Sequence, residues 1–394
     1  MTDFTTDLAQ ALVQKENLNE VFRIHLEQAV NTLLANELSA FLDYEKYDRA
    51  GFGSGNSRNG AYPRTLRTEF GNLSLVIPRD RNGDFKQQTV APYKRSNETL
   101  ESFVIHMYHK GVTTSEIGDL LERMYGQHYT PQTISNMTKA MEKEVAAFKE
   151  RPLAARYVCV YLDATFIALK RDTVAKEAVY IAVGIREDGS KEVLAYAIAP
   201  TESAAVWKEV LEDIKHRGVE DVLLFIADGL KGMPDSVFSV FPTSKYQTCC
   251  VHVARSLAHK VRVADRAEIC EDFKSVYRAS SENEARQALD DFSIKWKKRY
   301  LKAILALRDN PYLLTFYQFP RSIWRSIYST NLIESFNKQL KKYTKRKEQF
   351  PNEHAIERFL VSQFDAYNQK FTTRCHIGFD LARSEIETLF ENRG

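Results

Sequence analysis

The stretch "YVCVYLDATF", Tyr157–Phe166, is where the hydrophobic pattern of the chain changes from helical to extended. Its apolar residues run almost without interruption, as in a strand that is buried on both faces. "AVYIAVGIREDGSKEVLAYAIAP", Ala178–Pro200, adds two apolar strands joined by Asp188-Gly189, a dipeptide typical of a tight hairpin turn. Together these stretches predict three consecutive antiparallel strands.

Helices and strands alternate after this hairpin. Ser203–Gly218 carries apolar residues at helical spacing, and "EDVLLFIADG", Glu220–Gly229, is another buried strand. Lys245–Val261 is predicted to be a short strand that runs into a helix. The order β-β-β-α-β-(α)-β-α predicts an α/β fold, with helices on the faces of a mixed sheet.

The region upstream is predicted to be helical, apart from one basic β-hairpin around Gly71-Asn72 with Arg79 and Arg81 at its exit. Residues 101–148 have the pattern of a helix-turn-helix. Thr113 and Glu116 form a capping box, and Thr130 precedes a proline at the start of the second helix. That helix exposes polar side chains that suit base edges: Gln132, Thr133, Ser135, Asn136 and Lys139. An ordinary helical hairpin explains the same pattern equally well.

The composition describes a soluble globular protein of 394 residues, with 44% hydrophobic and 27% charged residues. We expect no secretory signal and no transmembrane helix, because the N-terminal stretch is acidic and no apolar run is long enough. The five cysteines are scattered and odd in number, which favours a reducing cytoplasm over a disulfide framework.

The net charge is only +3, but the basic residues are clustered. Residues 321–347 hold eight Lys or Arg and one Glu, and residues 56–95 hold eight basic and three acidic residues. Such clusters are typical of nucleic-acid binding, although one cluster alone is more often a solvated surface.

Two aspartates follow the predicted strands, Asp163 in "YLDATF" and Asp228 in "FIADGL". Either one alone is more often a turn or a helix cap. If the first and fourth strands are neighbours, however, both carboxylates meet at the carboxyl ends of the strands, where sites in such sheets form. Two ions of Mg²⁺ or Mn²⁺ about 4 Å apart are the standard arrangement for attack on a phosphodiester, and carboxylates are their preferred ligands.

Glu334, in "IYSTNLIESFNKQLKKYTKRK", is the candidate third carboxylate. It is also expected at the N3 position of a capping box if Asn331 is the N-cap. At 100° per residue it lies opposite the apolar stripe of its helix and beside Lys338, Lys341 and Lys345. We expect the cap to hold Glu334 in position as a metal ligand.

These motifs resemble those of the Mutator-type transposases of bacterial insertion sequences. The resemblance rests on "LDAT", "ADGLKG", "CCVHVARSL" and "IYSTNLIESFNKQLKKYTKRKEQFP", and on the upstream "SRNGAYPRTLRTEFGNLSLVIPRDRNGDF". It covers residues 50–360. One departure is Ser329-Thr330, where the family often has two threonines.

The resemblance implies an RNase H-like catalytic domain whose DDE triad is Asp163, Asp228 and Glu334, with an all-helical insertion before the glutamate. It implies that metal ions held by the triad activate water to nick DNA at terminal inverted repeats, and that the freed 3′-OH attacks a second phosphodiester. A joined-end circle is often the first product. We expect at least a homodimer, because two ends must be paired, and a bacterial protein that associates with the nucleoid when bound to DNA.

This interpretation divides the chain into seven segments. They are an N-terminal helical region (1–55), a basic β-hairpin segment (56–100), a helix-turn-helix region (101–150), the first part of the catalytic domain (151–259), the helical insertion (260–325), the completion of the catalytic domain (326–360) and a C-terminal helical region (361–394).

Further residues are predicted to support the site. The family's Cys-x-x-His motif matches Cys249 and His252, which we expect to be a buried structural pair more than a metal site, since no second pair lies nearby. Trp296 is a candidate for stacking on an unpaired base, but a core position is the better explanation. The basic residues expected to hold DNA are Arg79, Arg81, Arg321, Arg325, Lys338, Lys341, Lys342, Lys345 and Arg346.

Two other functions fit parts of the sequence. A tyrosine recombinase would use His252, Arg255 and Tyr277, form a covalent phosphotyrosine and need no divalent metal. A non-catalytic DNA-binding protein derived from a transposase would need only the helix-turn-helix and the basic clusters. The presence of all three carboxylates argues against lost catalysis.

Overall fold

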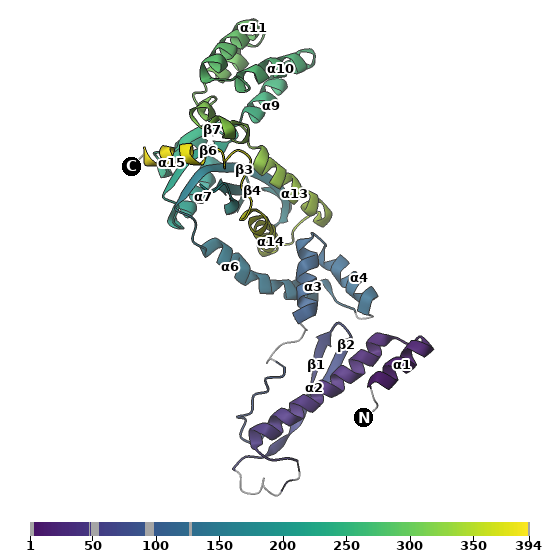
Figure 1. Cartoon of the computed structure of the whole chain (residues 1–394). Coiled ribbons are helices and arrows are strands. Elements are labelled where there is room, and N and C mark those ends of the chain that lie inside the picture. The colour runs from purple at the N-terminus through teal and green to yellow at the C-terminus, as the bar shows by residue number, and fades with distance from the viewer. Residues whose placement is uncertain (1–3, 47, 49–54, 91–97, 126–127, 393–394) are drawn as a thin grey trace. The chain divides into compact units, whose positions relative to one another are not determined.

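The computed structural model describes residues 4–46, 48, 55–90, 98–125 and 128–392 (Figure 1). These residues form two compact units, Met1–Ala140 and Met141–Gly394. The boundary between the units falls inside the segment 101–150, whereas the division into seven segments stays a prediction. No helix in the described ranges has the length and apolar character needed to cross a membrane.

The second unit is built on a five-stranded mixed sheet, in agreement with the predicted α/β fold. The strand order is β5-β4-β3-β6-β7. The pairs β3–β4 and β4–β5 are antiparallel, and the pairs β3–β6 and β6–β7 are parallel. The strands are β3 (Arg156–Lys170), β4 (Val174–Ile185), β5 (Lys191–Ala199), β6 (Asp221–Ala227) and β7 (Lys245–Thr248).

Helices cover both faces of this sheet, which is why its strands are apolar on both sides. On one face, α7 (Ala204–His216) buries Trp207 and Leu211 against the strands, next to α8 (Met233–Val240). Near the other face lie α13 (Asn331–Lys347) and α14 (Glu353–Phe371), as Figure 1 shows. The unit also contains α6 (Glu142–Glu150) and α15 (Arg383–Glu391).

The first strand of the sheet is longer than the sequence suggested. Asp163 does not end β3, because the strand continues beside β4 as far as Lys170. The parallel neighbour β6 ends at this point, because Leu162 and Ala227 form the last β3–β6 pair. Farther on, Phe350 pairs with the edge of β3 that β6 has left open, through hydrogen bonds to Ala168 and Lys170. Pairing with β4 and Phe350 therefore keeps the chain extended beyond Asp163.

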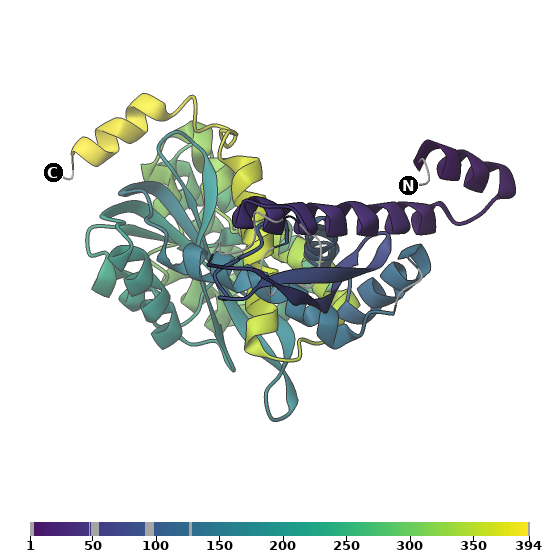
Figure 2. The same cartoon turned by 90° about the horizontal axis from the view of Figure 1, so that it is seen from below.

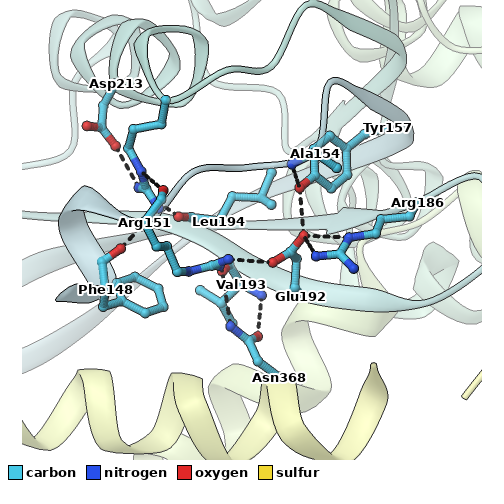
Figure 3. A network of polar contacts seen from close by, with 11 residues as sticks. Phe148, Arg151, Ala154, Tyr157, Arg186, Glu192, Val193, Leu194, Asp213 and Asn368 are labelled. Atoms are coloured by element: carbon cyan, nitrogen blue, oxygen red, sulfur yellow. Dashed lines mark hydrogen bonds and ion pairs between the residues drawn. The ribbon is translucent and has the colours of Figure 1, made fainter. Parts of the chain in front are cut away.

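A bulge at Leu194 interrupts the pairing of β4 with β5. A bulge leaves backbone groups without strand partners, and here side chains supply them (Figure 3). Asn368 of α14 accepts a hydrogen bond from the Val193 N–H at 2.7 Å, and Arg217 donates to the Leu194 carbonyl at 3.0 Å. The bulge therefore fixes α14 against β5.

The chain leaves the sheet at the end of β7 and comes back to its point of departure at Thr330, which contacts Cys249. The departing Cys250 N–H bonds to the Tyr328 carbonyl at 2.9 Å, and the Thr330 N–H lies 3.3 Å from Cys249 Sγ. All residues between these two points are described, and none is in a strand, as predicted for 260–325. The helices of this excursion are α9 (Cys250–Lys260), α10 (Arg266–Tyr277), α11 (Glu282–Arg308) and α12 (Trp324–Ile327).

The first unit pairs a long helix with a β-hairpin. Figure 2 shows α2 (Leu18–Leu42) lying along β1 (Arg58–Thr68) and β2 (Gly71–Asp80), and Leu34 packs on the inward residues of β2. The turn is at Glu69-Phe70, two residues before the predicted one, and the strands are long. The remaining helix before α2 is α1 (Phe4–Gln14).

Three short helices complete the first unit: α3 (Glu98–His109), α4 (Thr114–Tyr125) and α5 (Pro131–Thr138). The predicted caps are present. The Thr113 hydroxyl accepts from the Glu116 N–H at 3.1 Å while Glu116 accepts from the Thr113 N–H, and Thr130 caps α5. Gly126 is a glycine at which the first helix of a helix-turn-helix can end, and it lies outside the described residues.

Candidate active site

Asp163 and Asp228 stand side by side at one edge of the sheet. Each directly follows a residue of the last β3–β6 pair, Leu162 with Ala227, on adjacent parallel strands. Asp228 begins the turn after β6, where its carboxylate accepts a hydrogen bond from the Leu230 N–H at 3.3 Å. The predicted meeting of the two aspartates is therefore what the sheet order produces, although Asp163 lies within its strand.

Asp163 is held from the side by α13. Asn337 Nδ2 donates to Asp163 Oδ2 at 2.8 Å. Burial raises the pKa of Asp163 to about 6; the Asn337 hydrogen bond opposes this rise, and the charges of Asp228 and Glu334 add to it. Asp228 and Glu334 are therefore close enough for their negative charges to disfavour the ionised form of Asp163. The Asn337 Oδ1 atom is buried beside them without a hydrogen-bond partner among the described atoms.

Glu334 is fixed by Arg255 of α9. Arg255 donates from its two terminal nitrogens to Glu334 Oε1 and Oε2 at 2.8 and 2.9 Å, and His252 Nε2 lies 3.4 Å from Oε1. Burial acts to raise the pKa of Glu334, but the hydrogen bonds and charge of Arg255 outweigh it and the pKa is lowered. The carboxylate is therefore held in its ionised form.

The predicted capping box at Glu334 is wrong. The helix α13 begins at Asn331, so Thr330 is the N-cap, and it makes no side-chain cap. Its hydroxyl bonds instead to Cys249 Sγ and His252 Nδ1, each at 3.3 Å. The N-cap is therefore one residue before the predicted Asn331, and its hydroxyl is already engaged. Glu334 is positioned by Arg255 and not by a capping box.

Cys249 and His252 lie together at the start of α9, where the Thr330 hydroxyl contacts both, and His252 is only partly buried. Cys249 is fully buried; burial acts to raise the pKa of its thiol, but hydrogen bonds from His252 and Thr330 lower it. The pKa of His252 rises to about 9, first through its hydrogen bond with Cys249 and also through Glu334 and Asp163. A charged His252 between the cysteine and the carboxylates ties α9 to the start of α13.

A cavity of about 480 Å³ opens beside Asp228. It is lined by Thr248 of β7, His252 of α9 and the end of α11 at Leu307 and Asn310. Space for a ligand therefore adjoins one aspartate on the side of the excursion helices.

The carboxylates fit a divalent ion only in part. Asp163 and Asp228 offer oxygens on adjacent strands, and such oxygens suit Mg²⁺ or Mn²⁺. In the described ranges, however, no three His, Cys, Asp or Glu side chains are gathered closely enough to hold one ion. Arg255 engages both carboxylate oxygens of Glu334, so Glu334 is not free to act as a third ligand in this structure.

The basic residues predicted to hold DNA are at the surface. On α13, Lys338, Lys341, Lys342 and Lys345 are exposed, whereas the side chain of Arg346 lies outside the described residues. Arg321 and Arg325 are exposed before the helix, and Arg79 and Arg81 are exposed in the first unit. On α5, Gln132 and Asn136 are exposed and Thr133 is half-buried, and Lys139 is exposed directly after the helix.

The two aromatic candidates are buried. Trp296 is 1% exposed, and its indole N–H donates to Asp272 at 2.8 Å, so it has the core position that the sequence favoured over stacking. Tyr277, the nucleophile of the recombinase alternative, packs against the rings of Phe273 and Tyr328, and burial raises its pKa.

Sequence reasoning missed two residues of this site. Asn337 was not singled out, although it follows Glu334 by three positions and therefore shares its side of the helix. Arg255 was considered only for the recombinase, because no local pattern pairs it with a glutamate 79 positions later.

The model of the family "Transposase, Mutator family" matches residues 2–373. The chain is 50% identical over 391 residues to the transposase for insertion sequence element IS905 of Lactococcus lactis subsp. lactis, covering 99% of this chain and 100% of that protein. It is 47% identical over 368 residues to the transposase for insertion sequence element IS1201 of Lactobacillus helveticus, covering 93% and 100%.

Among solved structures, the Drosophila P element transposase strand transfer complex is similar with a TM-score of 0.30 and 10% identity, over 79% of this chain and 88% of that one. The catalytic domain of Mos1 mariner transposase has a TM-score of 0.18 and 12% identity, over 45% and 97%. The sequence matches, which run over almost the whole length, show that this chain belongs to the Mutator family of transposases.

Proposed function

We propose that this protein binds the terminal inverted repeats of an insertion sequence and catalyses DNA cleavage and strand transfer with Asp163, Asp228 and Glu334. Family membership supports the choice of reaction. The observation that carries the choice of residues is the sheet edge where two aspartates follow the last β3–β6 pair and a third carboxylate acts on Asp163. Perturbed carboxylates gathered at strand ends are typical of functional sites.

Two Mg²⁺ or Mn²⁺ ions would supply the Lewis acid at this edge, polarising the scissile phosphate and activating water or a 3′-OH. Asp163 and Asp228 would be their first ligands, with Asn337 orienting Asp163 through its 2.8 Å hydrogen bond. The pKa of Asp163 is raised because the carboxyl group is buried near two other carboxylates. A bound cation would lower this pKa and hold Asp163 in its ionised form, which supports the assignment.

Glu334 completes the triad in this proposal when Arg255 turns to another anion. Arg255 has a half-exposed side chain, and a guanidinium binds phosphate as well as it binds carboxylate. DNA backbone that reaches the site would therefore compete for Arg255 and free Glu334. The exposed lysines of α13 would hold that backbone beside the carboxylates.

The remaining parts of the proposal concern DNA recognition and assembly. Helices α4 and α5 would act as a helix-turn-helix, since α5 begins with a cap and exposes Gln132 and Asn136. The excursion between Cys249 and Thr330 would be the helical insertion of an RNase H-like domain, because its two ends touch. Two copies would pair the two ends of the element on bacterial DNA.

The test is strand cleavage of a duplex that carries the element's end, with Mg²⁺ or Mn²⁺. We expect Asp163→Ala, Asp228→Ala and Glu334→Ala each to slow nicking by at least about 100-fold while end binding persists, because a metal ligand contributes several kcal/mol to the transition state. Glu212→Ala, an exposed glutamate of α7, is the matched control and should nick normally. The assay is a denaturing gel of labelled strands.

Three outcomes would reject this assignment. Full activity of Glu334→Ala would remove Glu334 from the triad. End binding by the wild-type protein without nicking would favour a non-catalytic DNA-binding protein. Cleavage in EDTA, or its loss in Tyr277→Phe while Asp163→Ala stays active, would favour the recombinase.

A further inference from the structure

A second cavity, of about 400 Å³, lies on the opposite side of α13 from Glu334. Its lining comes from α13 (Leu332, Phe336 and Gln339 among others), from α14, from the segment after α14 and from Lys191 at the start of β5. At 100° per residue these three residues point away from Glu334 and from the lysines beside it. The cavity is therefore separate from the candidate triad, and its volume is typical of a small-ligand pocket, which is roughly 300–1,000 Å³.

Aromatic rings form one wall of this cavity. The rings of Phe336 and Tyr367 lie 4.7 Å apart, and those of Tyr367 and Phe371 lie 4.5 Å apart. Phe336 is buried, whereas Tyr367 and Phe371 are only partly covered, so their ring surface borders the open space. Such rings are the platforms on which unpaired bases stack.

Positive charge collects at the same place. Lys191 Nζ lies 4.1 Å from the centre of the Phe371 ring, and Lys370 Nζ lies 5.2 Å from it. Within the described ranges no ion pair joins either lysine to a carboxylate. Burial lowers the pKa of Lys191, and the charges of Lys370 and Arg374 lower it further. These cations lack an anion that would neutralise them.

The neighbouring His376 does not supply one. Its Nδ1 lies 3.4 Å from Lys191 Nζ, and burial, with the charge of Lys191, lowers the pKa of the imidazole to about 4. The ring is therefore neutral at pH 7 and accepts a hydrogen bond from Lys191 at Nδ1. With Nδ1 accepting from Lys191, the neutral ring keeps its Nε2–H as a donor, and the Gln339 amide, which also lines the cavity, offers a donor and an acceptor. These groups suit the edge of a base, whereas the lysines suit a phosphate.

We propose that this cavity binds one unpaired nucleotide of the DNA substrate, with its base against Tyr367 and Phe371 and its phosphate on Lys191 and Lys370. The inference rests on the proposed DNA transposase function. It assigns to α14 the stacking role that the sequence offered for Trp296, which the structure buries in the excursion helices. Aromatic rings beside unneutralised cations match a nucleotide better than an inorganic anion, which would leave the rings without a partner.

The experiment measures binding to a duplex with one extrahelical 2-aminopurine and to the same duplex fully paired. We expect the wild-type protein to bind the bulged duplex about 10-fold more tightly and to quench its fluorescence, since stacking on an aromatic contributes about 1–3 kcal/mol per base. Phe371→Ala should bring the affinity ratio to about one and restore the fluorescence. Lys370→Gln, at an exposed position, should lower the affinity for the bulged duplex without affecting folding.

A control variant separates this site from its surroundings. Lys208→Gln, which changes an exposed lysine of α7, should keep the wild-type ratio. Thymidine monophosphate should compete with the bulged duplex better than inorganic phosphate does. The assignment to a nucleotide would be overturned if thymidine monophosphate and inorganic phosphate competed equally, or if an abasic bulge gave the same affinity ratio. It would also be overturned if a poly-glutamate peptide displaced the bulged duplex and thymidine monophosphate did not.

The two proposals fail in different ways. A wild-type protein that nicks the end-bearing duplex but binds bulged and paired DNA equally would overturn the nucleotide site and leave the transposase function intact. A protein that neither binds nor nicks DNA would overturn both. If Phe371→Ala melts at a lower temperature than the wild type, its loss of binding is not decisive. Lys370→Gln, which should melt like the wild type, then tests the nucleotide site through its affinity for the bulged duplex.

Discussion

Arg255 and Asn337 decide where two of the three candidate carboxylates lie. Asn337 binds Asp163 from α13, and Arg255 binds Glu334 from α9, so each carboxylate is positioned by an element other than its own. The sequence could supply the carboxylates, because aspartates after buried strands are a local pattern. It could not supply their partners, because a contact between residues far apart in the chain leaves no local signal.

The paired hydrogen bonds from Arg255 to Glu334 should contribute measurably to the free energy of unfolding. We expect Arg255→Ala to lower the free energy of unfolding by about 1–2 kcal/mol, because Glu334 is 11% exposed and loses two charge-assisted hydrogen bonds. Arg255→Lys should recover only part of this loss, since an ammonium cannot reproduce the planar fork. Urea unfolding is the measurement.

Arg286→Ala is the matched control for this comparison. Arg286 pairs with Glu282 one turn away on the exposed side of α11, and such pairs contribute about 0.5 kcal/mol or less. If Arg255→Ala destabilises the protein no more than Arg286→Ala does, the Arg255–Glu334 pair has no structural role.

At the scale of single elements, β5 shows what the hydrophobic pattern can and cannot predict. The two apolar runs and the Asp188-Gly189 turn placed β4 and β5 correctly, and Gly189 has the positive φ of 80° that the turn requires. The bulge at Leu194 was not predictable, because it depends on Arg217 and Asn368 from other elements.

The same strand holds a buried ion cluster around Glu192 (Figure 3). Tyr157 donates to Glu192 at 2.6 Å, Arg151 at 2.7 Å and Arg186 at 2.7 Å. Burial acts to raise the pKa of Glu192, but these partners outweigh it and the pKa lies below 4.5. Glu192→Gln should therefore cost about 3 kcal/mol of unfolding free energy at pH 7, because two arginines lose their counter-charge.

This effect should depend on pH with a definite sign. Because the folded-state pKa is below the unfolded value, the stabilisation is fully present above pH 4.5 and is lost as the pH falls through the folded-state pKa. The difference between wild type and Glu192→Gln should shrink over that range in denaturant titrations. Glu212→Gln, at an exposed position, should change stability by about 0.5 kcal/mol or less at every pH. A pH-independent difference would exclude ionisation of Glu192 as the cause.

At the scale of the whole molecule, the sequence predicted the order of the elements but placed α6 with the helix-turn-helix. The structure gives α6 to the second unit, where Phe148 is buried and its carbonyl accepts from Arg217 at 3.0 Å. Periodicity identifies a helix and its apolar side, but it does not say which of two cores that side joins.

A fragment that starts at Met141 should therefore fold by itself. We expect residues 141–394 to show a cooperative thermal transition by circular dichroism, because the whole sheet and its covering helices lie within this unit. A fragment that starts at Arg151 lacks α6 and should be less stable by several kcal/mol, since the buried side chains of Val145 and Phe148 are lost. Equal stability of the two fragments would show that α6 is dispensable.

The touching ends of the excursion, Cys249 and Thr330, have a consequence for how such chains can change in length. The position of Glu334 is set by α9 and by the pairing of Phe350 with β3, not by the number of residues in between. Helices α10 and α11 can therefore be lengthened, shortened or exchanged without moving the carboxylate, because the entropy of closing a longer loop grows only slowly. The sheet edge that carries the candidate carboxylates and the helical excursion can thus diverge in evolution as independent modules.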